Sequence, residues 1–200
     1  MASTSIRAAK NALRKEIKKK IACLSDEEKK RQSEIVTRKL FQMPQYQSSQ
    51  RVSVFLNMHD EIHTLPIVKN LLENNKKCYI PRYIGTTMDM VRLLSLQDYE
   101  DLPVTSWKIK QPADDEQRED AITTGGLDLI LVPGLSFTKD GDRLGRGKGY
   151  YDTYLSRCEK DTNKKPYTIA LAYKEQVLES VPTDELDFRI DTVLYEDSAA

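Results

Sequence analysis

The sequence has few cysteines and no long apolar run, and both absences argue against whole classes of protein. Its three cysteines, Cys23, Cys78 and Cys158, form no CxxC pair, which argues against a zinc ribbon or a disulfide scaffold. No stretch approaches the roughly 18 apolar residues of a membrane span, and the basic N-terminal region lacks the apolar core of a signal peptide. We therefore expect a cytoplasmic protein with no membrane partner and with reduced cysteines in or near its core.

The sequence also lacks a net charge, because its 31 basic residues balance its 31 acidic residues. A neutral chain has no overall field to attract nucleic acid, so any anion site must be local. The chain contains 39% hydrophobic and 31% charged residues, as globular proteins do, and its 200 residues suit one well-cored domain better than two. We predict a single domain over residues 1–200, acting as a monomer without a nucleic-acid partner.

Hydrophobic patterning predicts strands that alternate with helices. The predicted strands are residues 51–57, 76–81, 88–94, 127–134, 167–173 and 190–196. The predicted helices are residues 5–24, 25–43, 64–75 and 150–160, the last beginning near Lys148. Ser25 and Glu28 have the spacing of a capping box at the start of the second helix. This alternation indicates an α/β layered domain with a mostly parallel sheet, whereas residues 95–124 are expected to be loop with short elements.

The first predicted helix carries a lysine on its apolar face. On a wheel of about 100° per residue, the large apolar side chains between Ile6 and Ile21 fall within a wedge of about 80°. Lys10 lies inside this wedge and Arg14 lies at its edge. Two interpretations remain open: the stem of Lys10 snorkels to the surface, or Lys10 and Arg14 form a cationic clamp for an anion.

A glycine-rich loop, GDRLGRGKGYY from Gly141, lies between the strand predicted at residues 127–134 and the following helix. In parallel sheets, ligands collect beyond the carboxyl ends of strands, where loops lead into helix N-termini. The alternating glycines Gly145, Gly147 and Gly149 allow the backbone to approach a ligand closely, and the helix N-terminus favours an anion. Phosphate fits this description.

Two common phosphate motifs do not match the loop. A Walker A sequence requires glycine where Asp142 stands and serine or threonine where Gly149 stands. The GxGxxG fingerprint fails as well, because the glycines of the loop alternate. From composition alone, the loop is a phosphate site, a flexible surface turn or an RGG-like RNA contact, and the neutral charge of the chain weakens the last of these.

Two further polar features accompany the loop. Asp152 falls in the first turn of the following helix, where it either stabilises the helix dipole or offers a hard oxygen ligand to Mg²⁺. The stretch HDEIH, His59 to His63, differs from the zinc motif HExxH in the position of its glutamate. An acidic loop after a strand is better suited to holding a substrate amide or a ring N–H.

At PGLSFTKDGDRLGRGKGYYDTYL the sequence resembles the 5-formyltetrahydrofolate cyclo-ligase family. The likeness extends to KNALRKEI, FLNMHDEI, IPRY, MDMVR and DFRIDTVLYED, and so covers almost the whole chain. The resemblance implies a three-layer α/β/α fold and a Mg²⁺-requiring reaction that converts 5-formyltetrahydrofolate and ATP into 5,10-methenyltetrahydrofolate, ADP and phosphate. It also implies that the formyl oxygen attacks the γ-phosphate before N10 closes the ring.

The resemblance further implies a role for individual residues. Those implied to bind ATP are Lys10, Asn11, Ala12, Leu13, Arg14, Arg143, Leu144, Gly145, Arg146, Gly147, Lys148, Gly149, Tyr150 and Tyr151. Those implied to contact the folate are Arg14, Leu56, Glu61, Trp107, Arg146, Gly147, Lys148, Gly149, Tyr150 and Tyr151. Asp152 and Asp187 match the family's Mg²⁺ positions, and Arg146 and Lys148 are the implied catalytic residues.

Two other classes of function remain possible at this point. A non-catalytic nucleotide or phosphosugar sensor would keep the glycine loop without needing the pair Asp152 and Asp187, and would bind ATP without hydrolysing it. An RNA-binding module would lose affinity steeply as salt rises.

Overall fold

The computed structural model describes residues 2–106, 108–162 and 164–198. Trp107, one of the predicted folate contacts, lies outside the described residues. Within the described part of the chain, no helix is both long enough and apolar enough to span a membrane. The described cysteines are unpaired, and Cys78 and Cys158 are buried as predicted, whereas Cys23 is exposed.

The elements alternate along the chain largely as the hydrophobic pattern predicts. The helices are α1 (Ala2–Ala22), α2 (Asp26–Gln42), α3 (Pro44–Ser48), α4 (Leu65–Glu73), α5 (Leu96–Asp101), α6 (Tyr150–Asp161) and the 3-10 turn η1 (Lys174–Gln176). The strands are β1 (Arg51–Ser53), β2 (Lys77–Ile84), β3 (Thr87–Leu93), β4 (Leu129–Val132), β5 (Ser136–Thr138), β6 (Arg143–Leu144), β7 (Tyr167–Leu171), β8 (Val177–Leu178) and β9 (Thr192–Leu194).

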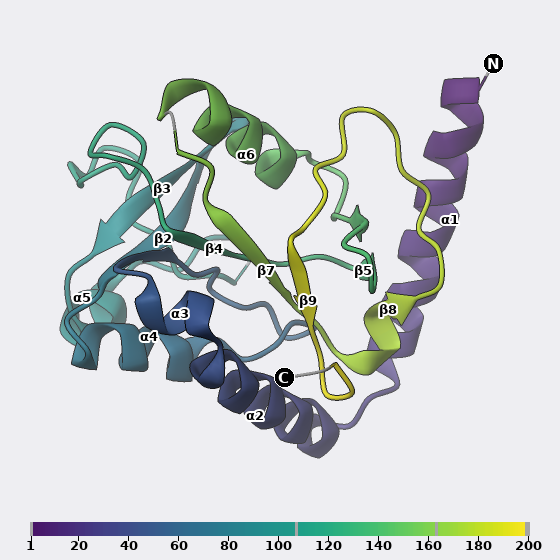
Figure 1. Cartoon of the computed structure of the whole chain (residues 1–200), viewed down its shortest axis with the longest axis horizontal. Coiled ribbons are helices and arrows are strands. Elements are labelled where there is room, and N and C mark those ends of the chain that lie inside the picture. Colours follow the sequence, from purple (N-terminus) through teal and green to yellow (C-terminus); the bar gives the residue numbers. More distant parts are fainter. Residues whose placement is uncertain (1, 107, 163, 199–200) are drawn as a thin grey trace.

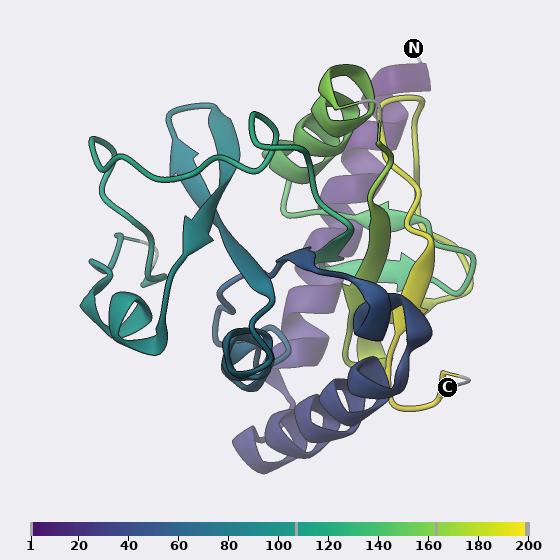
Figure 2. The same ribbon diagram turned by 60° about the vertical axis from the view of Figure 1, so that its left-hand side comes forward.

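The central sheet has the strand order β3-β2-β1-β4-β7-β9. Each neighbouring pair from β2 to β9 is parallel, and β3 pairs antiparallel with β2 at one edge. Figures 1 and 2 show the twist of this sheet and the hairpin of β2 and β3 that extends from it. Because the parallel strands share a direction, the loops that follow β1 and β4 emerge at the same edge of the sheet.

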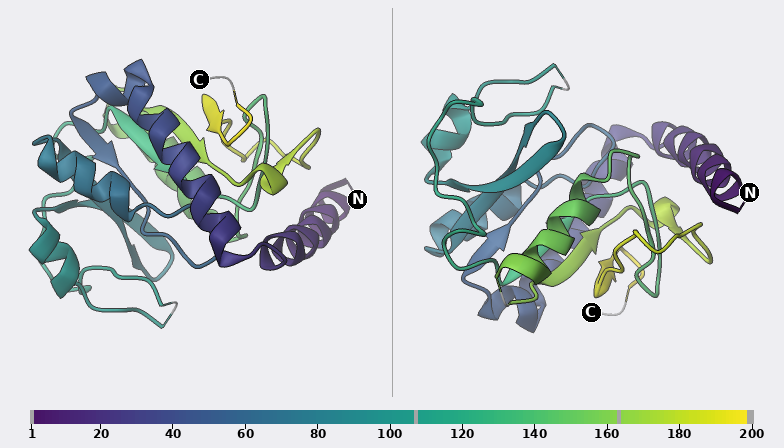
Figure 3. Two further views of the ribbon diagram at one scale, coloured as in Figure 1. Left: turned by 90° about the horizontal axis from the view of Figure 1, so that it is seen from below. Right: turned by 90° about the horizontal axis from the view of Figure 1, so that it is seen from above.

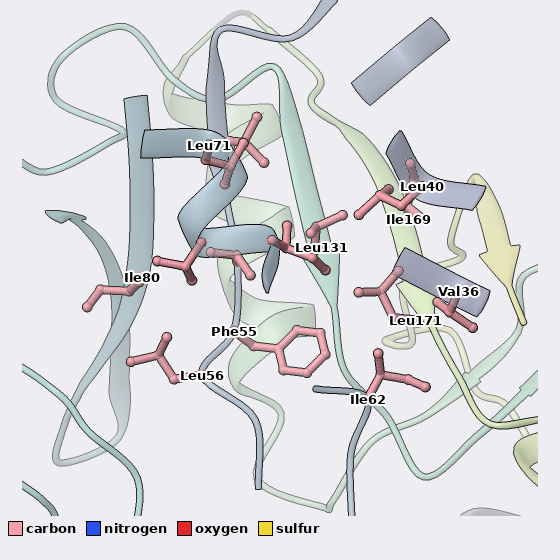
Figure 4. Close-up of a cluster of buried hydrophobic side chains, with 14 of the residues drawn as sticks. Val36, Leu40, Phe55, Leu56, Ile62, Leu71, Ile80, Leu131, Ile169 and Leu171 are labelled. Carbon is pink, nitrogen blue, oxygen red and sulfur yellow. The ribbon is translucent and has the colours of Figure 1, made fainter. Parts of the chain in front are cut away.

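Helices cover both faces of the central sheet and produce three layers. Figure 3 shows α2 and α4 crossing one face and α6 crossing the other. Alternate residues of β4 enter different cores: Leu129 and Leu131 join the cluster beneath α2 and α4, whereas Ile130 and Val132 join the cluster beneath α6. Figure 4 shows the first cluster around Leu131. The α/β/α prediction is therefore confirmed.

A second small sheet, with the order β6-β5-β8, was not predicted. Its strands contain two or three residues each, too few for hydrophobic alternation to be recognised. The helix α3 was also missed, because its five residues are too few to show a helical pattern of apolar residues. Strand β6 lies within the glycine-rich loop, so this small sheet fixes the start of that loop.

One predicted detail at a helix end needs correction. The Ser25 hydroxyl accepts a hydrogen bond from the backbone N of Glu28 at 3.1 Å, as a capping residue does. The Glu28 carboxylate, however, does not complete a capping box: it accepts hydrogen bonds from Arg31 and Gln32. Helix α6 begins at Tyr150, the first residue of the helix predicted at residues 150–160, and Gly149 precedes it in a left-handed conformation with φ of 72°.

Candidate active site

A cavity of about 820 Å³ lies beyond the carboxyl ends of β1 and β4. Residues of α1, of the loops that follow these strands, of the glycine loop, of α6 and of the segment around Asp187 line it. Predicted site residues that line it are Arg14, Leu56, Glu61, Arg143, Gly145, Arg146, Gly147, Lys148, Gly149, Tyr150, Tyr151, Asp152 and Asp187. The fold therefore brings the predicted nucleotide and folate contacts to one cavity.

Five predicted ATP contacts are not part of the cavity wall. These are Lys10, Asn11, Ala12, Leu13 and Leu144. Two of them support residues that do line it, since Lys10 binds Asp187 and the Asn11 side chain accepts a hydrogen bond from Arg14 at 2.7 Å. Leu13 packs against the main core, Leu144 is buried and Ala12 is exposed.

The glycine loop passes directly beneath Arg14 of α1. The Nε of Arg14 donates a hydrogen bond to the carbonyl oxygen of Gly145 at 2.9 Å. Gly147 has φ of 102°, and a Cβ added to it would lie 3.4 Å from the Arg14 guanidinium carbon. A side chain at position 147 would touch Arg14 at ordinary contact distance but would be strained by the positive φ, so the backbone conformation favours glycine there.

Arg143 lies inside the loop and does not reach freely into the cavity. Its Nη1 donates to the carbonyl oxygen of Pro133 at 3.1 Å, and its Nη2 donates to Asp152 Oδ2 at 2.8 Å. The other Asp152 oxygen accepts a hydrogen bond from the backbone N of Phe188 at 3.1 Å. Only 4% of the Arg143 side chain is exposed, so it joins the strand end, the loop and α6 from within.

Arg146 joins the glycine loop to the acidic loop that follows β1. Its Nη1 and Nη2 donate to the two carboxylate oxygens of Asp60 at 3.1 and 2.7 Å. Its Nε and Nη2 also donate to Glu61 Oε1 at 3.1 and 2.9 Å. One guanidinium therefore connects the glycine loop to two carboxylates of the acidic loop.

The two carboxylates that bind Arg146 have different environments. Burial raises the pKa of Glu61, even though Arg146 and the backbone of Met58 favour its ionised form. Burial also acts to raise the pKa of Asp60, but hydrogen bonds and charge from Arg146 outweigh it and lower that pKa. The backbone carbonyl of Glu61 accepts a hydrogen bond from the Tyr173 hydroxyl at 2.7 Å, which fixes the acidic loop to the end of β7.

Lys10 is ion-paired, so the snorkelling interpretation of this residue is wrong. Its Nζ lies 2.6 Å from Asp184 Oδ2 and 2.5 Å from Asp187 Oδ2, and the residue is 8% exposed. Burial acts to lower the pKa of Lys10, but the two carboxylates outweigh it and raise that pKa. Asp184 was not predicted, although it lies three residues before the predicted Asp187.

The two carboxylates predicted to hold Mg²⁺ both line the cavity but are already paired. Asp152 binds Arg143 and the backbone of Phe188, the residue after Asp187, whereas Asp187 binds Lys10. Among the described residues, no group of three or more His, Cys, Asp or Glu side chains is placed to hold a metal. Two carboxylates nevertheless suit Mg²⁺, which in nucleotide sites takes its remaining ligands from phosphates and water.

Aromatic side chains form the wall of the cavity near Glu61. The rings of Tyr83 and Tyr150 lie 4.9 Å apart between centroids, and the Tyr150 hydroxyl donates to the carbonyl oxygen of Gly85 at 2.9 Å. Burial raises the pKa of Tyr151 well above its usual value. Tyr83 was missed, although it lies two residues after the strand predicted at residues 76–81, and a position just beyond a strand end is the kind of signal that could have found it.

These features define a class: an α/β/α domain with a cationic glycine loop and an acidic loop facing one cavity. A family model described as the 5-formyltetrahydrofolate cyclo-ligase family matches residues 6–196. The mouse (Mus musculus) 5-formyltetrahydrofolate cyclo-ligase is 52% identical, with all of both chains covered. A Caenorhabditis elegans protein described as a probable 5-formyltetrahydrofolate cyclo-ligase is 38% identical, covering 96% of this chain and 95% of the relative.

Solved structures agree with this likeness. The 5,10-methenyltetrahydrofolate synthetase of Aquifex aeolicus superposes with a TM-score of 0.77 at 31% identity, covering 94% of this chain and 90% of that one. The synthetase of Mycoplasma pneumoniae, at 22% identity and a TM-score of 0.70, shares the fold. The chain belongs to the 5-formyltetrahydrofolate cyclo-ligase family and is a ligase.

Proposed function

We propose that this chain converts 5-formyltetrahydrofolate and ATP into 5,10-methenyltetrahydrofolate, ADP and phosphate. The observation that carries this proposal is the contact of Arg146 with Asp60 and Glu61. It joins a loop suited to phosphates to a buried carboxylate suited to ring and amide N–H groups, within one cavity. Phosphoryl transfer between two bound substrates requires the nucleotide site and the folate site to lie next to each other.

The first step is attack of the formyl oxygen on the γ-phosphorus of ATP. An O–P bond forms while the bond to the bridging oxygen breaks, and ADP leaves. Negative charge on the transferring group requires positioned cations. Lys148 is exposed at the cavity wall and supplies a point charge, whereas Arg146 supplies a fixed N–H donor.

The second step closes the ring. N10 attacks the activated formyl carbon, a C–N bond forms, the C–O bond to phosphate breaks, and the N10 proton is lost. Glu61 lines the cavity, and in this proposal its buried carboxylate accepts a hydrogen bond from an N–H of the pterin or of N10. The aromatic wall of Tyr150 and Tyr151 provides flat surfaces on which the folate packs.

Mg²⁺ belongs to the same proposal. Asp152 and Asp187 both line the cavity and would hold the ion on the nucleotide side. When bound, Mg²⁺ supplies positive charge to the phosphate oxygens. Lys10 and Arg143, which now neutralise these two carboxylates, keep the pair of acids together within the protein.

The test is absorbance at the methenyl band after purified protein is mixed with 5-formyltetrahydrofolate, Mg²⁺ and ATP. We expect the band to grow only when ATP is present, with one ADP released for each methenyl product. A flat trace from folded protein that still binds ATP would contradict the proposal and favour a nucleotide sensor.

A further inference from the structure

Asp60 contacts a residue of the cavity wall without belonging to that wall. Arg146 and Glu61 line the cavity, whereas Asp60 does not. The Asp60 side chain is 13% exposed, and both of its oxygens bind the Arg146 guanidinium. Asp60 is therefore connected to the cavity through Arg146.

The hydrogen bonds of Arg146 account for most of its donors. A guanidinium has five N–H groups, one on Nε and two on each Nη. Nε donates to Glu61, Nη2 donates to Asp60 and to Glu61, and Nη1 donates once to Asp60. Among the contacts of the described residues, a single N–H on Nη1 is left for an incoming oxygen.

The structure assigns Asp60 as the positioning residue that orients this remaining N–H of Arg146 toward the reacting oxygens. The inference rests on the proposed function. Asp60 grips the guanidinium by two parallel bonds, the geometry that fixes an arginine most tightly. A donor held in one orientation before the substrates meet does not have to be reorganised during phosphoryl transfer.

The two carboxylates that bind Arg146 have different roles in this inference: one contacts the ligand and the other orients the arginine. Glu61 lines the cavity, so under the proposed function its hydrogen bonds to Arg146 compete with hydrogen bonds to the folate. Asp60 does not line the cavity, so we expect it to keep its two bonds to Arg146 when Glu61 turns to a ligand. The backbone of the acidic loop holds Asp60 in place, because the carbonyl oxygen of Glu61 accepts a hydrogen bond from the Tyr173 hydroxyl at 2.7 Å.

The decisive variant is Asp60→Asn, which keeps the shape of the side chain but replaces one accepting oxygen by a donor. We expect kcat to fall at least tenfold, while KM for ATP and for 5-formyltetrahydrofolate each change less than threefold. Asp140→Asn is the matched control, because Asp140 is exposed and does not line the cavity. A wild-type kcat in Asp60→Asn would overturn the inference, as would a loss that appears only in KM.

A double-mutant cycle shows whether Asp60 acts through Arg146. Arg146→Lys removes the planar fork, so adding Asp60→Asn to it should cause no more than a twofold further loss of kcat. Losses that multiply in full would mean that Asp60 acts independently, and would contradict the inference.

Two further measurements keep the test decisive. If Asp60→Asn does not fold, Asp60→Glu tests the inference instead, because its extra methylene displaces the guanidinium of Arg146. We expect this variant to have a lowered kcat with unchanged KM values. A wild-type kcat would overturn the inference. Absence of the methenyl product with wild-type protein would instead refute the proposed reaction, so the two failures are distinguishable.

Discussion

The ammonium nitrogen of Lys10 lies 2.5 Å from Asp187 Oδ2, a contact between residues 177 positions apart in the sequence. It fastens α1 to the segment that precedes β9, and it places a buried cation directly behind an acid of the cavity wall. The same nitrogen lies 2.6 Å from Asp184, so one lysine keeps two carboxylates together.

Lys10→Met should destabilise the protein, because it leaves Asp184 and Asp187 next to each other without a cation. Losing a partner of a buried polar group costs about 1 to 3 kcal/mol, and the 41% exposure of the Asp184 side chain favours the lower half of that range. Urea denaturation measures the change in unfolding free energy. Lys15→Met is the control on the same helix, because Lys15 is exposed. Unchanged stability of Lys10→Met would show that the ion pair contributes nothing to stability.

Lys148→Ala should lower kcat/KM by roughly tenfold to a hundredfold, the equivalent of one charged hydrogen bond of about 1.5 to 3 kcal/mol. The fold should be unaffected, since Lys148 is exposed. Steady-state kinetics at saturating folate and varied ATP measure the effect. Lys139→Ala, an exposed lysine outside the cavity wall, should retain wild-type kinetics. Equal activities of the two variants would remove Lys148 from the mechanism.

The layers of the fold could be predicted because the apolar residues of each long helix or strand recur at the spacing typical of that element. The uninterrupted apolar run from Leu129 to Val132 indicates a buried strand, and this strand, β4, lies in the interior of the sheet. The sheet formed by β5, β6 and β8 could not be predicted, because two or three residues show no alternation and their pairing depends on distant partners.

The residues of the candidate site were easier to predict from the sequence than the side chains with which they pair. The glycine loop and Glu61 were identified from the sequence, but the pairing of Arg146 with Asp60 joins residues 86 positions apart and leaves no local pattern. Lys10 was recognised as unusual because it interrupts an apolar face. Whether it was snorkelling or paired depended on Asp184 and Asp187, whose position follows only from the folded chain.

Asp152→Asn should raise the Mg²⁺ concentration needed for half-maximal activity, because a charged oxygen ligand becomes a neutral amide. It should also lower stability, since the buried Arg143 loses its ion-pair partner. A Mg²⁺ titration of activity in folded protein separates the two effects. Asp142→Asn is a control within the same loop, because Asp142 is half-buried but does not line the cavity. If the Asp152→Asn titration matches wild type, Asp152 has a structural role alone.

Glu28→Gln should remove part of the acid sensitivity of folding. Hydrogen bonds from Arg31 and Gln32 lower the pKa of Glu28 from its usual 4.5 to about 2. A carboxylate whose pKa is lower in the folded state stabilises the fold above its unfolded pKa, and this stabilisation is lost as the pH falls from about 4.5 to about 2. The wild type should therefore have a higher urea midpoint than Glu28→Gln at pH 7, and the two midpoints should converge near pH 2.

Glu34→Gln is the control on the same helix, where the Glu34 carboxylate lies 4.0 Å from Lys30. This variant should change the urea midpoint little at either pH, because such exposed pairs contribute little to stability. A difference between wild type and Glu28→Gln that stays constant across this range would mean that the Glu28 charge does not contribute to stability.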